Sequence, residues 1–342
     1  PKIISGDNPQ TVAALATQAG LGPDLQAISG PELAEMATPQ RATAVETTTI
    51  FGRITPDQKE ELVGLLERNG HYVAMIGDGV NDVLSLKRAN LGIAMQSGSE
   101  ATRAVADIVL LCDSFAALPI AVEEGQRIRN GLRNILKLFL SRVLSVALLL
   151  MAVMILGGFP FDPKHISILT TLTVGIPSIA LATWAQPGRS PRGSVTPALM
   201  HFVLPAALTL SIAGIAVYVF VALTARENVA SIAQTALTVM AVPCGLVLLP
   251  FVSPPTRWWE GVSAFTGDWR PTYLAIGLFF SFVGVLALPP LRSFFGLVPL
   301  DMKSYLAIAA IVLVWTLVLR LTWRARLLER FLGVDQLSSP AG

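Results

Sequence analysis

YVAMIGDGVND, residues 72–82, is the stretch that decides the fold of the first third of the chain. Its apolar half, residues 72–76, predicts a strand that is buried in a parallel sheet. The run ends at Gly77 and Gly79, which permit a tight turn and let a ligand approach the backbone closely. The stretch therefore predicts a ligand site at the carboxyl edge of a sheet, where open α/β folds bind their ligands.

Oxygen-bearing side chains crowd the turn that follows this strand. Asp78, Asn81 and Asp82 place two carboxylates and an amide close together. Such hard oxygen ligands suit Mg²⁺ next to a phosphoryl group. The alternative is purely structural: the same residues can form an Asp-Gly turn followed by an Asn or Asp helix cap. The full block and its partner loops, described below, favour the magnesium and phosphate interpretation.

Short apolar strands alternate with helical patterns from residue 1 to about residue 125, which predicts a parallel α/β sheet domain. Strands are expected at residues 2–5, 26–29, 47–53, 72–76, 91–95 and 107–111. Helices are expected at residues 9–19, 31–36, 56–68, 81–89 and 99–106.

Three loops of this domain are expected to converge at one edge of the sheet. They are residues 5–8, 55–59 and 77–82. The Ser5 hydroxyl and the backbone amides of Gly6 and Asp7 can hold phosphoryl oxygens. Lys59 can supply the positive charge that a transferring phosphoryl group needs. Taken singly, Lys59 is typical of a solvated helix lysine and Asp7 of a turn residue, so only their combination indicates a site.

The remaining two-thirds of the chain is strongly apolar. The 342 residues are 53% hydrophobic and 14% charged, whereas soluble domains carry roughly 25% charged residues. About six runs reach the length of about 20 residues that crosses a bilayer. They cover residues 134–156, 166–184, 199–224, 229–252, 272–291 and 304–323. An all-α transmembrane bundle is predicted, with buried soluble helices as the alternative. The net charge of +2 is too small to indicate nucleic acid as a partner.

Basic residues gather on alternate connections, which orients the bundle by the positive-inside rule. The basic side carries Arg127, Arg129, Arg133, Lys137, Arg189, Arg192, Arg257, Arg270, Arg324, Arg326 and Arg330. The soluble domain and the C-terminal tail, residues 324–342, are therefore expected in the cytoplasm, with a transmembrane domain at residues 126–323 between them in sequence. Residues 113–136 predict one unbroken helix that leads into the first span.

The three loops, in this order, resemble the phosphorylation domain of P-type ATPases, which belongs to the haloacid dehalogenase-like superfamily. The family's TGDN is similar to Ser5-Gly6-Asp7-Asn8, and its TGDGVND to residues 76–82, with Ile in place of the first Thr. Its lysine motif matches residues 51–59. The resemblance implies a haloacid dehalogenase-like, Rossmann-type fold. It continues into the membrane spans, which look like the last six helices of a bacterial, type II pump.

The resemblance also implies a role for each matching residue, with ATP and Mg²⁺ as cofactors. Asp78 would hold Mg²⁺, Lys59 would contact the phosphoryl group and Ser5 would bind a phosphoryl oxygen. The supporting residues would be Gly6, Asp7, Asn81 and Asp82. The family's nucleophile, the Asp of a DKTGT segment, does not occur in this sequence. We therefore expect a C-terminal part of a longer protein, inactive alone, whose partners include the missing N-terminal domains of the same chain.

The cation ligands of calcium-pump relatives have no counterpart in this sequence. Their Asn and Asp correspond to Thr170 and Val174, and their Asn and Glu to Val143 and Val146. A proline in the second span would interrupt the helix and free backbone carbonyls for a cation. The candidates for the transport path are Ser141, Arg142, Ser145, Thr170, Thr173 and Pro177. Hydroxyl side chains in membrane helices also commonly bond back to their own backbone, which is the alternative for the Ser and Thr residues.

Arg142 is the one charged residue well inside the first span. It either snorkels to the cytoplasmic interface or acts as a built-in counter-charge near the transport path. The expected function is ATP-driven transport of a cation across the cell membrane through an aspartyl-phosphate. Calcium is the first candidate for the transported cation, by family resemblance alone. Membrane lipid is expected as a further partner. The alternatives are a membrane-tethered phosphohydrolase of the same superfamily without transport, and a non-catalytic membrane partner with a vestigial half-site.

Overall fold

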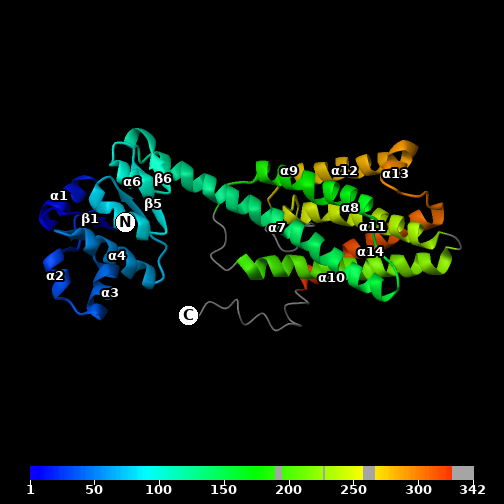
Figure 1. Ribbon diagram of the computed structural model, residues 1–342, viewed down its shortest axis with the longest axis horizontal. Coiled ribbons are helices and arrows are strands. Elements are labelled where there is room, and N and C mark those ends of the chain that lie inside the picture. The colour runs from blue at the N-terminus through cyan, green and yellow to red at the C-terminus, as the bar shows by residue number, and fades with distance from the viewer. Residues whose placement is uncertain (189–194, 226–227, 257–265, 326–342) are drawn as a thin grey trace. The chain divides into compact units, whose positions relative to one another are not determined.

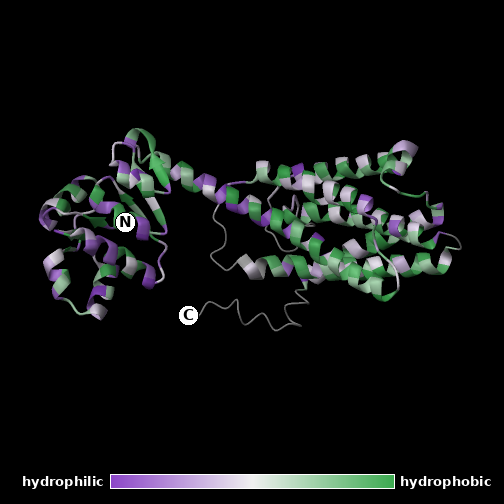
Figure 2. Ribbon diagram, viewed as in Figure 1, coloured by the Kyte–Doolittle hydropathy of each residue, from purple (hydrophilic) through white to green (hydrophobic). Residues whose placement is uncertain are grey.

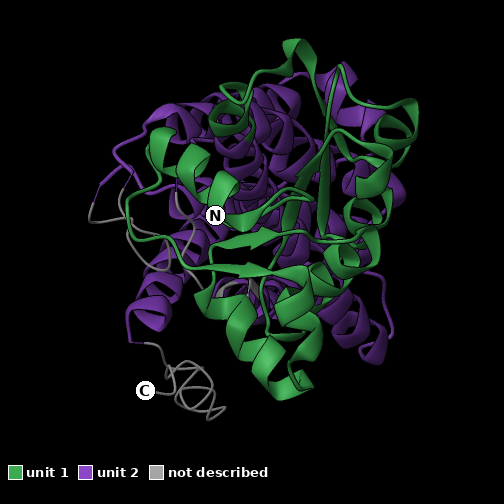
Figure 3. Ribbon diagram, turned by 90° about the vertical axis from the view of Figure 1, so that its left-hand side faces the viewer, with its two compact units in different colours: residues 1–121 green, residues 122–342 purple. Residues whose placement is uncertain are grey.

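The computed structural model describes residues 1–188, 195–225, 228–256 and 266–325. Contacts between residues divide the chain into two compact units, Pro1–Ala121 and Val122–Gly342, which Figure 3 colours separately. Several basic residues that predict the orientation lie outside the described residues, together with most of the tail at 324–342. They are Arg189, Arg192, Arg257, Arg326 and Arg330. Each unit is described by itself below.

The first unit alternates strands and helices as expected (Figure 1). Its strands are β1 (Ile3–Ile4), β2 (Ala27–Ser29), β3 (Ile50–Gly52), β4 (Ala74–Gly77), β5 (Leu91–Met95) and β6 (Ile108–Leu110). Its helices are α1 (Pro9–Gln18), α2 (Gly30–Glu35), α3 (Thr38–Thr47), α4 (Pro56–Arg68), α5 (Val83–Arg88) and α6 (Glu100–Val105), with 3₁₀ turns η1 (Val80–Asp82) and η2 (Leu111–Asp113).

The strands are parallel, but they form two sheets where one was expected. Within the described residues the orders are β1-β3-β2 and β4-β5-β6, with Ile4 opposite Phe51 and Gly77 opposite Ala94. The expectation of a single sheet is therefore wrong for this chain. The two sheets stay separate because no described strand pairs with both β1 and β4: β1 pairs only with β3, and β4 pairs only with β5. In the part of the chain that the structure describes, both strands keep one edge free of a partner strand.

Central strand β3 is buried on both faces, which holds the loop that follows it in place. Ile50 is 0% exposed and packs with Val12 and Ala16 of α1. Phe51 is 1% exposed and packs on the other side with Leu62 of α4. Successive side chains of a strand point to opposite faces, so the two helices cover the two faces of this sheet.

Helix α3 is the element that the sequence reasoning missed. Thr47, expected at the start of a strand, is the last residue of this helix, and β3 begins only at Ile50. The helix starts with Pro39 in its first turn, and the Gln40 side chain accepts a hydrogen bond from the Ala37 amide at 3.1 Å. These start signals outweigh the β-branched Thr residues that favoured a strand.

The second unit is a bundle of apolar helices (Figures 1 and 2). They are α7 (Ala117–Ile155), α8 (Pro163–Thr170), π-helical turn η3 (Thr171–Gly175), α9 (Ile176–Trp184), α10 (Val195–Thr224), α11 (Val229–Val252), α12 (Arg270–Ala287), α13 (Pro289–Phe294) and α14 (Met302–Arg324). The unbroken helix expected over residues 113–136 is confirmed from Ala117 onward by α7, which runs for 39 residues; Asp113 instead ends the turn η2 with a positive φ of 50°.

Six helical segments of the described residues are long and apolar enough to cross a membrane, in agreement with the predicted spans. In α11, 89% of the most apolar 18-residue stretch is buried inside the protein, whereas the corresponding stretches of the other five segments are 22–39% buried. Helix α11 also contacts α8, α10, α12 and α14. A helix that is apolar all round and covered by neighbours forms the centre of a bundle. The chain is thus a multi-pass membrane protein built around α11.

The second span is interrupted where the proline was expected to interrupt it. The Ile176 amide bonds the carbonyl of Thr171, five residues back, which defines the π turn η3 just before Pro177. Pro177 lacks an N–H group, so the regular ladder cannot continue through this turn. The interruption separates α8 from α9 and leaves Thr173 and Val174 buried within it.

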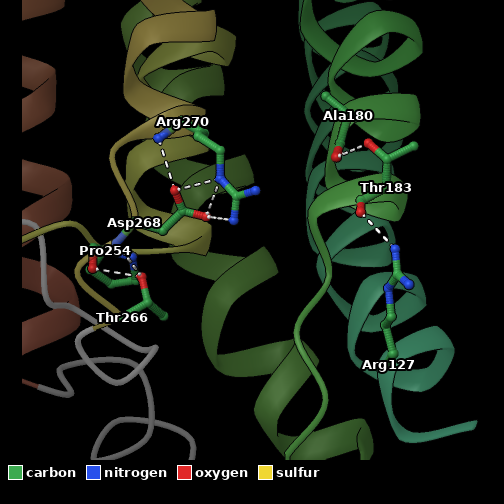
Figure 4. A network of polar contacts seen from close by, with 7 residues as sticks. All are labelled: Arg127, Ala180, Thr183, Pro254, Thr266, Asp268 and Arg270. Carbon is green, nitrogen blue, oxygen red and sulfur yellow. Dashed lines mark hydrogen bonds and ion pairs between the residues drawn. The ribbon is translucent and has the colours of Figure 1, made fainter. Parts of the chain in front are cut away.

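The helix ends of this unit are closed by polar contacts (Figure 4). Arg127 of α7 donates to the carbonyl of Thr183 near the end of α9 at 2.9 Å. Arg270 pairs with Asp268 at 2.9 Å at the start of α12, and its guanidinium lies 5.6 Å from the ring of Trp184. A basic side chain on a terminal carbonyl satisfies an acceptor that the helix itself leaves open.

Candidate active site and membrane cavity

Lys59 and Asp82 form the centre of the candidate site in the first unit. The Lys59 Nζ lies 2.6 Å from the Asp82 Oδ1, and the two side chains are only 13% and 9% exposed. Lys59 sits in the first turns of α4, which starts with a reciprocal capping box between Thr55 and Gln58. A capping box fixes where a helix begins, and thereby where its first turns point. The contact joins the loop at 55–59 to the loop at 77–82.

Asp82 is held from several sides at once. Its Oδ2 accepts a hydrogen bond from the Gly79 amide at 3.2 Å, and its carbonyl accepts one from the Ser85 hydroxyl at 2.9 Å. A Cβ atom at Gly77 would lie 2.6 Å from the Asp82 Cβ, so only glycine fits at that point of the turn. Asp82 therefore acts as the residue that fixes the Lys59 ammonium group in the site.

Asp78 presents the open carboxylate of this turn. Its residue is exposed, and in the described part of the chain its carboxylate has no hydrogen-bond partner. Its backbone carbonyl, by contrast, accepts from the Ser99 amide at 2.8 Å and from the Thr102 hydroxyl at 3.3 Å. Mg²⁺ binds through one or two carboxylates, water and phosphate oxygens, so this unpaired carboxylate fits the ion.

The loop at 5–8 is bonded through its backbone to the segment just before the loop at 55–59. The Arg53 amide donates to the Asp7 carbonyl at 2.7 Å, and the Ile54 amide to the Ser5 carbonyl at 3.0 Å. The Ser5 hydroxyl donates to the Asp7 carboxylate at 3.2 Å. Gly6 has open space around it, because a Cβ atom at this residue would meet nothing within 4 Å among the described residues. The loop at 5–8 therefore lies next to residues 53 and 54, which lead into the loop at 55–59, and exposed Gly6 has open space around it.

Ser99 and Thr102 were missed as parts of the site by the sequence reasoning. They hold the Asp78 carbonyl from α6, and a Cβ at Gly98 would lie 2.9 Å from the same oxygen. A helix start was visible at this point, because Ser99 is the N-cap and accepts from the Thr102 amide at 3.1 Å. What the pattern could not reveal is that this helix start packs against the turn at Asp78.

A small cavity lies in the second unit between α7, α8 with its π turn, α10 and α11. Its volume is about 20 Å³. Four of the predicted path residues line it, namely Ser141, Arg142, Ser145 and Thr173. Thr170 is exposed and lies outside the lining, as does Pro177. A Cβ at Gly245 would lie 2.6 Å from the Thr173 Cγ2, so α11 approaches the π turn closely at this glycine.

The hydroxyl groups of this cavity differ in their bonding. The Thr173 hydroxyl donates to the Leu169 carbonyl at 2.7 Å, and the Ser145 hydroxyl to the Arg142 carbonyl at 3.0 Å. These two follow the back-bonding alternative. The Ser141 hydroxyl is buried, and no hydrogen-bond partner for it occurs among the described residues.

Arg142 contacts an aromatic ring and the cavity. Its guanidinium lies 5.7 Å from the ring of Phe161, and the side chain lines the cavity. Phe161 is buried and belongs to the segment that connects α7 to α8. The attraction between the cation and the face of this ring draws the guanidinium inward. The two expected alternatives for Arg142, snorkelling to the interface and a counter-charge near the transport path, both stay predictions.

Known proteins resemble the chain in both units. Residues 2–90 match the family described as haloacid dehalogenase-like hydrolase. The calcium-transporting ATPase CtpE of Mycolicibacterium smegmatis is 37% identical over an alignment of 318 positions that covers 88% of this chain and 38% of that protein. CtpE of Mycobacterium bovis is 34% identical over an alignment of 347 positions that covers 97% of this chain and 41% of that protein. The similarity therefore runs through the site loops and the membrane helices alike.

Over most of its length the chain is similar to calcium- and cation-transporting ATPases. A more distant relative, the human calcium-transporting ATPase type 2C member 1, is 36% identical over 170 residues, 49% of this chain and 18% of that protein. The chain spans about two-fifths of the length of the CtpE proteins that it matches, 38% and 41%. The match to the haloacid dehalogenase-like family and the six apolar helices among the described residues both agree with this similarity.

Proposed function

We propose that the protein containing this chain uses ATP to drive a cation across the membrane through an aspartyl-phosphate. The observation that carries the proposal is the Lys59–Asp82 contact beside the open Asp78 carboxylate, in a chain that also has six apolar helices. Transfer of a phosphoryl group spreads negative charge over its oxygens, which a fixed cation and a carboxylate-bound metal ion stabilise. The similarity to ATPases named for calcium or cation transport supports the same function.

Each residue of the site has a task in this proposal. Asp78 holds Mg²⁺, which when bound neutralises charge on the phosphoryl oxygens. Lys59, fixed by Asp82, adds a second positive charge, and Ser5 donates a hydrogen bond from its hydroxyl. Because Asp82 holds the Lys59 ammonium group in place before the phosphate arrives, this charge needs little reorganisation to stabilise developing charge. Asn81 is exposed next to Asp82 and is assigned a supporting contact.

The nucleophilic carboxylate is proposed to come from a strand outside residues 1–342. Within the described residues, strands β1 and β4 each have one free edge, and the segments that follow β3 and β4 meet at the Lys59–Asp82 contact. A parallel strand that pairs with both edges would join the two sheets into one. Its carboxyl end would then lie among the three loops, since parallel strands end at the same side of a sheet. Alone, residues 1–342 are proposed to be inactive.

The remaining assignments follow from this function. Residues 1–125 are proposed as part of the phosphorylation domain, 126–323 as the transmembrane domain and 324–342 as a tail. The first unit and the tail are placed in the cytoplasm of the cell by the positive-inside rule. The cation is the partner in transport, and calcium is the first to test because of the CtpE relatives. None of the residues that line the described cavity is acidic, so a calcium site of carboxylates is not part of the proposal.

Transport and phosphorylation should be measured on the protein at its full natural length in lipid vesicles. Lys59→Ala and Asp78→Asn are expected to lower the yield of acid-stable phosphoprotein from radiolabelled ATP by about 100-fold or more, because each removes charge stabilisation. Lys87→Ala is the matched control, since Lys87 is an exposed lysine of α5. Uptake should be followed for Ca²⁺, Mg²⁺, Mn²⁺ and K⁺. Phosphate release with no uptake of any cation would favour the membrane-tethered phosphohydrolase.

A further inference from the structure

We propose that Gly98, Ser99 and Thr102, at the start of α6, are positioning residues that hold the backbone of Asp78 and set where its carboxylate meets a metal ion. This inference rests on the proposed function, in which Asp78 holds Mg²⁺. It deepens that function by adding a further segment, residues 98–102, to the three loops of the candidate site. The contacts that carry it all lie within the first unit.

Ser99 fixes the backbone of Asp78 through one short hydrogen bond. Its amide donates to the Asp78 carbonyl at 2.8 Å. On the side before Asp78, Gly77 is the last residue of β4 and is paired with β5. On the side after it, the Gly79 amide donates to the Asp82 carboxylate at 3.2 Å. Because the backbone is held before, at and after Asp78, its Cβ atom has a set position, and the carboxylate moves only by rotation of the side chain.

Thr102 holds Ser99 in the orientation that this hydrogen bond needs. Its hydroxyl is buried and lies 2.7 Å from the Ser99 carbonyl, 2.9 Å from the Ser99 hydroxyl and 3.3 Å from the Asp78 carbonyl. Its amide donates to the Ser99 hydroxyl at 3.1 Å. A hydroxyl has a single hydrogen to donate, and the shortest contact makes the Ser99 carbonyl its main acceptor. Thr102 therefore acts on Asp78 chiefly through Ser99.

Gly98 lets α6 start directly against the Asp78 backbone. A Cβ atom at residue 98 would lie 2.9 Å from the Asp78 carbonyl oxygen, 3.0 Å from the Met95 carbonyl oxygen and 3.1 Å from the Asp78 Cα. All three are backbone atoms, which cannot rotate away as the end of a side chain can. The φ angle of Gly98 is not positive, so the lack of space, and not the backbone conformation, requires glycine. An alanine at this position would force α6 and the turn at Asp78 apart.

Small shifts of a metal-binding carboxylate have a large effect on metal affinity. Mg²⁺ demands near-ideal octahedral geometry, with ligand oxygens at about 2.0–2.1 Å. Residues that orient a ligand without touching the ion typically contribute about 10- to 100-fold to the affinity. The segment at 98–102 meets the backbone of Asp78, so it suits such a role. The alternative is a purely structural role, in which α6 supports folding and leaves the metal affinity unchanged.

The experiment measures binding of Mn²⁺ to the protein at its full natural length in lipid nanodiscs, with inorganic phosphate and without ATP. Mn²⁺ is the probe because it takes the same oxygen ligands as Mg²⁺, and free Mn²⁺ is counted by electron paramagnetic resonance. The site that Asp78→Asn removes is the site under test. We expect Gly98→Ala to weaken its Mn²⁺ affinity by about tenfold or more, and Thr102→Val by about threefold. Thr102→Ser keeps the hydroxyl and should bind Mn²⁺ as the wild type does.

Matched variants separate positioning from folding. Thr48→Val is the control for Thr102→Val and should leave the affinity unchanged, because Thr48 is also buried in the first unit but lies at the end of α3. Gel filtration and thermal melting check that every variant folds. In phosphorylation by ATP, a high Mg²⁺ concentration should restore the yield of phosphoprotein in Gly98→Ala. It should not do so in Lys59→Ala, whose defect is a missing charge.

Failure of the positioning role is distinguishable from failure of the proposed function. If Asp78→Asn removes no Mn²⁺ site, the metal assignment of the proposed function fails, and the positioning role fails with it. If it removes a site, but folded Gly98→Ala and Thr102→Val bind Mn²⁺ like the wild type, only the positioning role is overturned. A Thr102→Ser affinity as weak as that of Thr102→Val also overturns it.

One further variant decides the case if Gly98→Ala and Thr102→Val do not fold. Ser99→Ala removes only the hydroxyl that caps α6, which costs about 1 kcal/mol of stability. A fall of about threefold in its Mn²⁺ affinity supports the positioning role, and an unchanged affinity overturns it.

Discussion

Asp82 shows how one residue can organise a site without binding the ligand itself. It contacts the Lys59 ammonium group at 2.6 Å and the Gly79 amide at 3.2 Å, and it leaves Asp78 open. The sequence placed both carboxylates in one turn, and Mg²⁺ was assigned to Asp78. Only the folded structure separates the partner of the lysine, Asp82, from the carboxylate that remains available.

The Lys59–Asp82 pair should matter far more for stability than a surface pair of the same unit. Asp82→Asn leaves the Lys59 charge in a largely buried place without a counter-charge, so we expect a loss of about 3 kcal/mol in the free energy of unfolding. Glu61→Gln is the matched control, because the Arg41–Glu61 pair at 2.8 Å is more exposed and should cost about 0.5 kcal/mol. Denaturant unfolding of the full-length protein measures both, and equal losses would contradict the prediction.

At the scale of elements, α3 shows why local patterns were insufficient. The run of Thr residues at 47–49 favoured a strand, yet Thr47 ends a helix that packs on α4. Two side chains that follow α4 in the sequence hold the last turn of α3. Asn69 donates to the Glu46 carboxylate at 2.7 Å, and His71 contacts the same carboxylate at 2.9 Å. Such contacts are distant in sequence, so no local pattern reports them.

This anchoring of α3 should depend on pH. The hydrogen bonds from Asn69 and His71 hold the pKa of Glu46 below its usual value of 4.5. A lowered pKa in the folded state means that Glu46 contributes its full stability above the unfolded pKa, and loses the contribution as pH falls through the folded pKa. Glu46→Gln should therefore lower the melting temperature at about pH 6 and have little effect at about pH 3.

Thermal melting of the full-length protein at several pH values checks this prediction. Glu60→Gln serves as the matched control, because Glu60 lies on α4 and forms no ion pair with any other described residue. A Glu46→Gln effect of equal size at both pH values would show that the carboxylate charge plays no part in holding α3.

At the scale of the whole molecule, two kinds of structure follow each other along one chain. The first unit keeps its apolar residues between sheets and helices, whereas the second exposes many large apolar side chains on helices such as α7 and α12. Large apolar surfaces of this kind are covered by lipid in a membrane. The orientation of the bundle is a prediction from basic residues, several of which lie outside the described part of the chain.

The two cysteines provide a direct test of that orientation. Cys112 is exposed in the first unit, and Cys244 is completely buried in α11. A membrane-impermeant maleimide should label Cys112 in inside-out vesicles and leave it unlabelled in intact cells, because the first unit is placed in the cytoplasm. Cys112→Ser is the control that assigns the label. Labelling of Cys112 from outside intact cells would reverse the proposed topology.

The sequence by itself determined that an α/β unit precedes a helical membrane unit, where the six spans lie, and which motif residues occupy the three loops at 5–8, 55–59 and 77–82. These features depend on composition, on the length of apolar runs and on short motifs. Only the tertiary structure decided that Lys59 bonds Asp82, that the described strands form two sheets, and that Arg142 turns inward over Phe161. Each of these depends on packing between segments that are distant along the chain. A local pattern sets what a segment can be, whereas its neighbours in space decide which groups it meets.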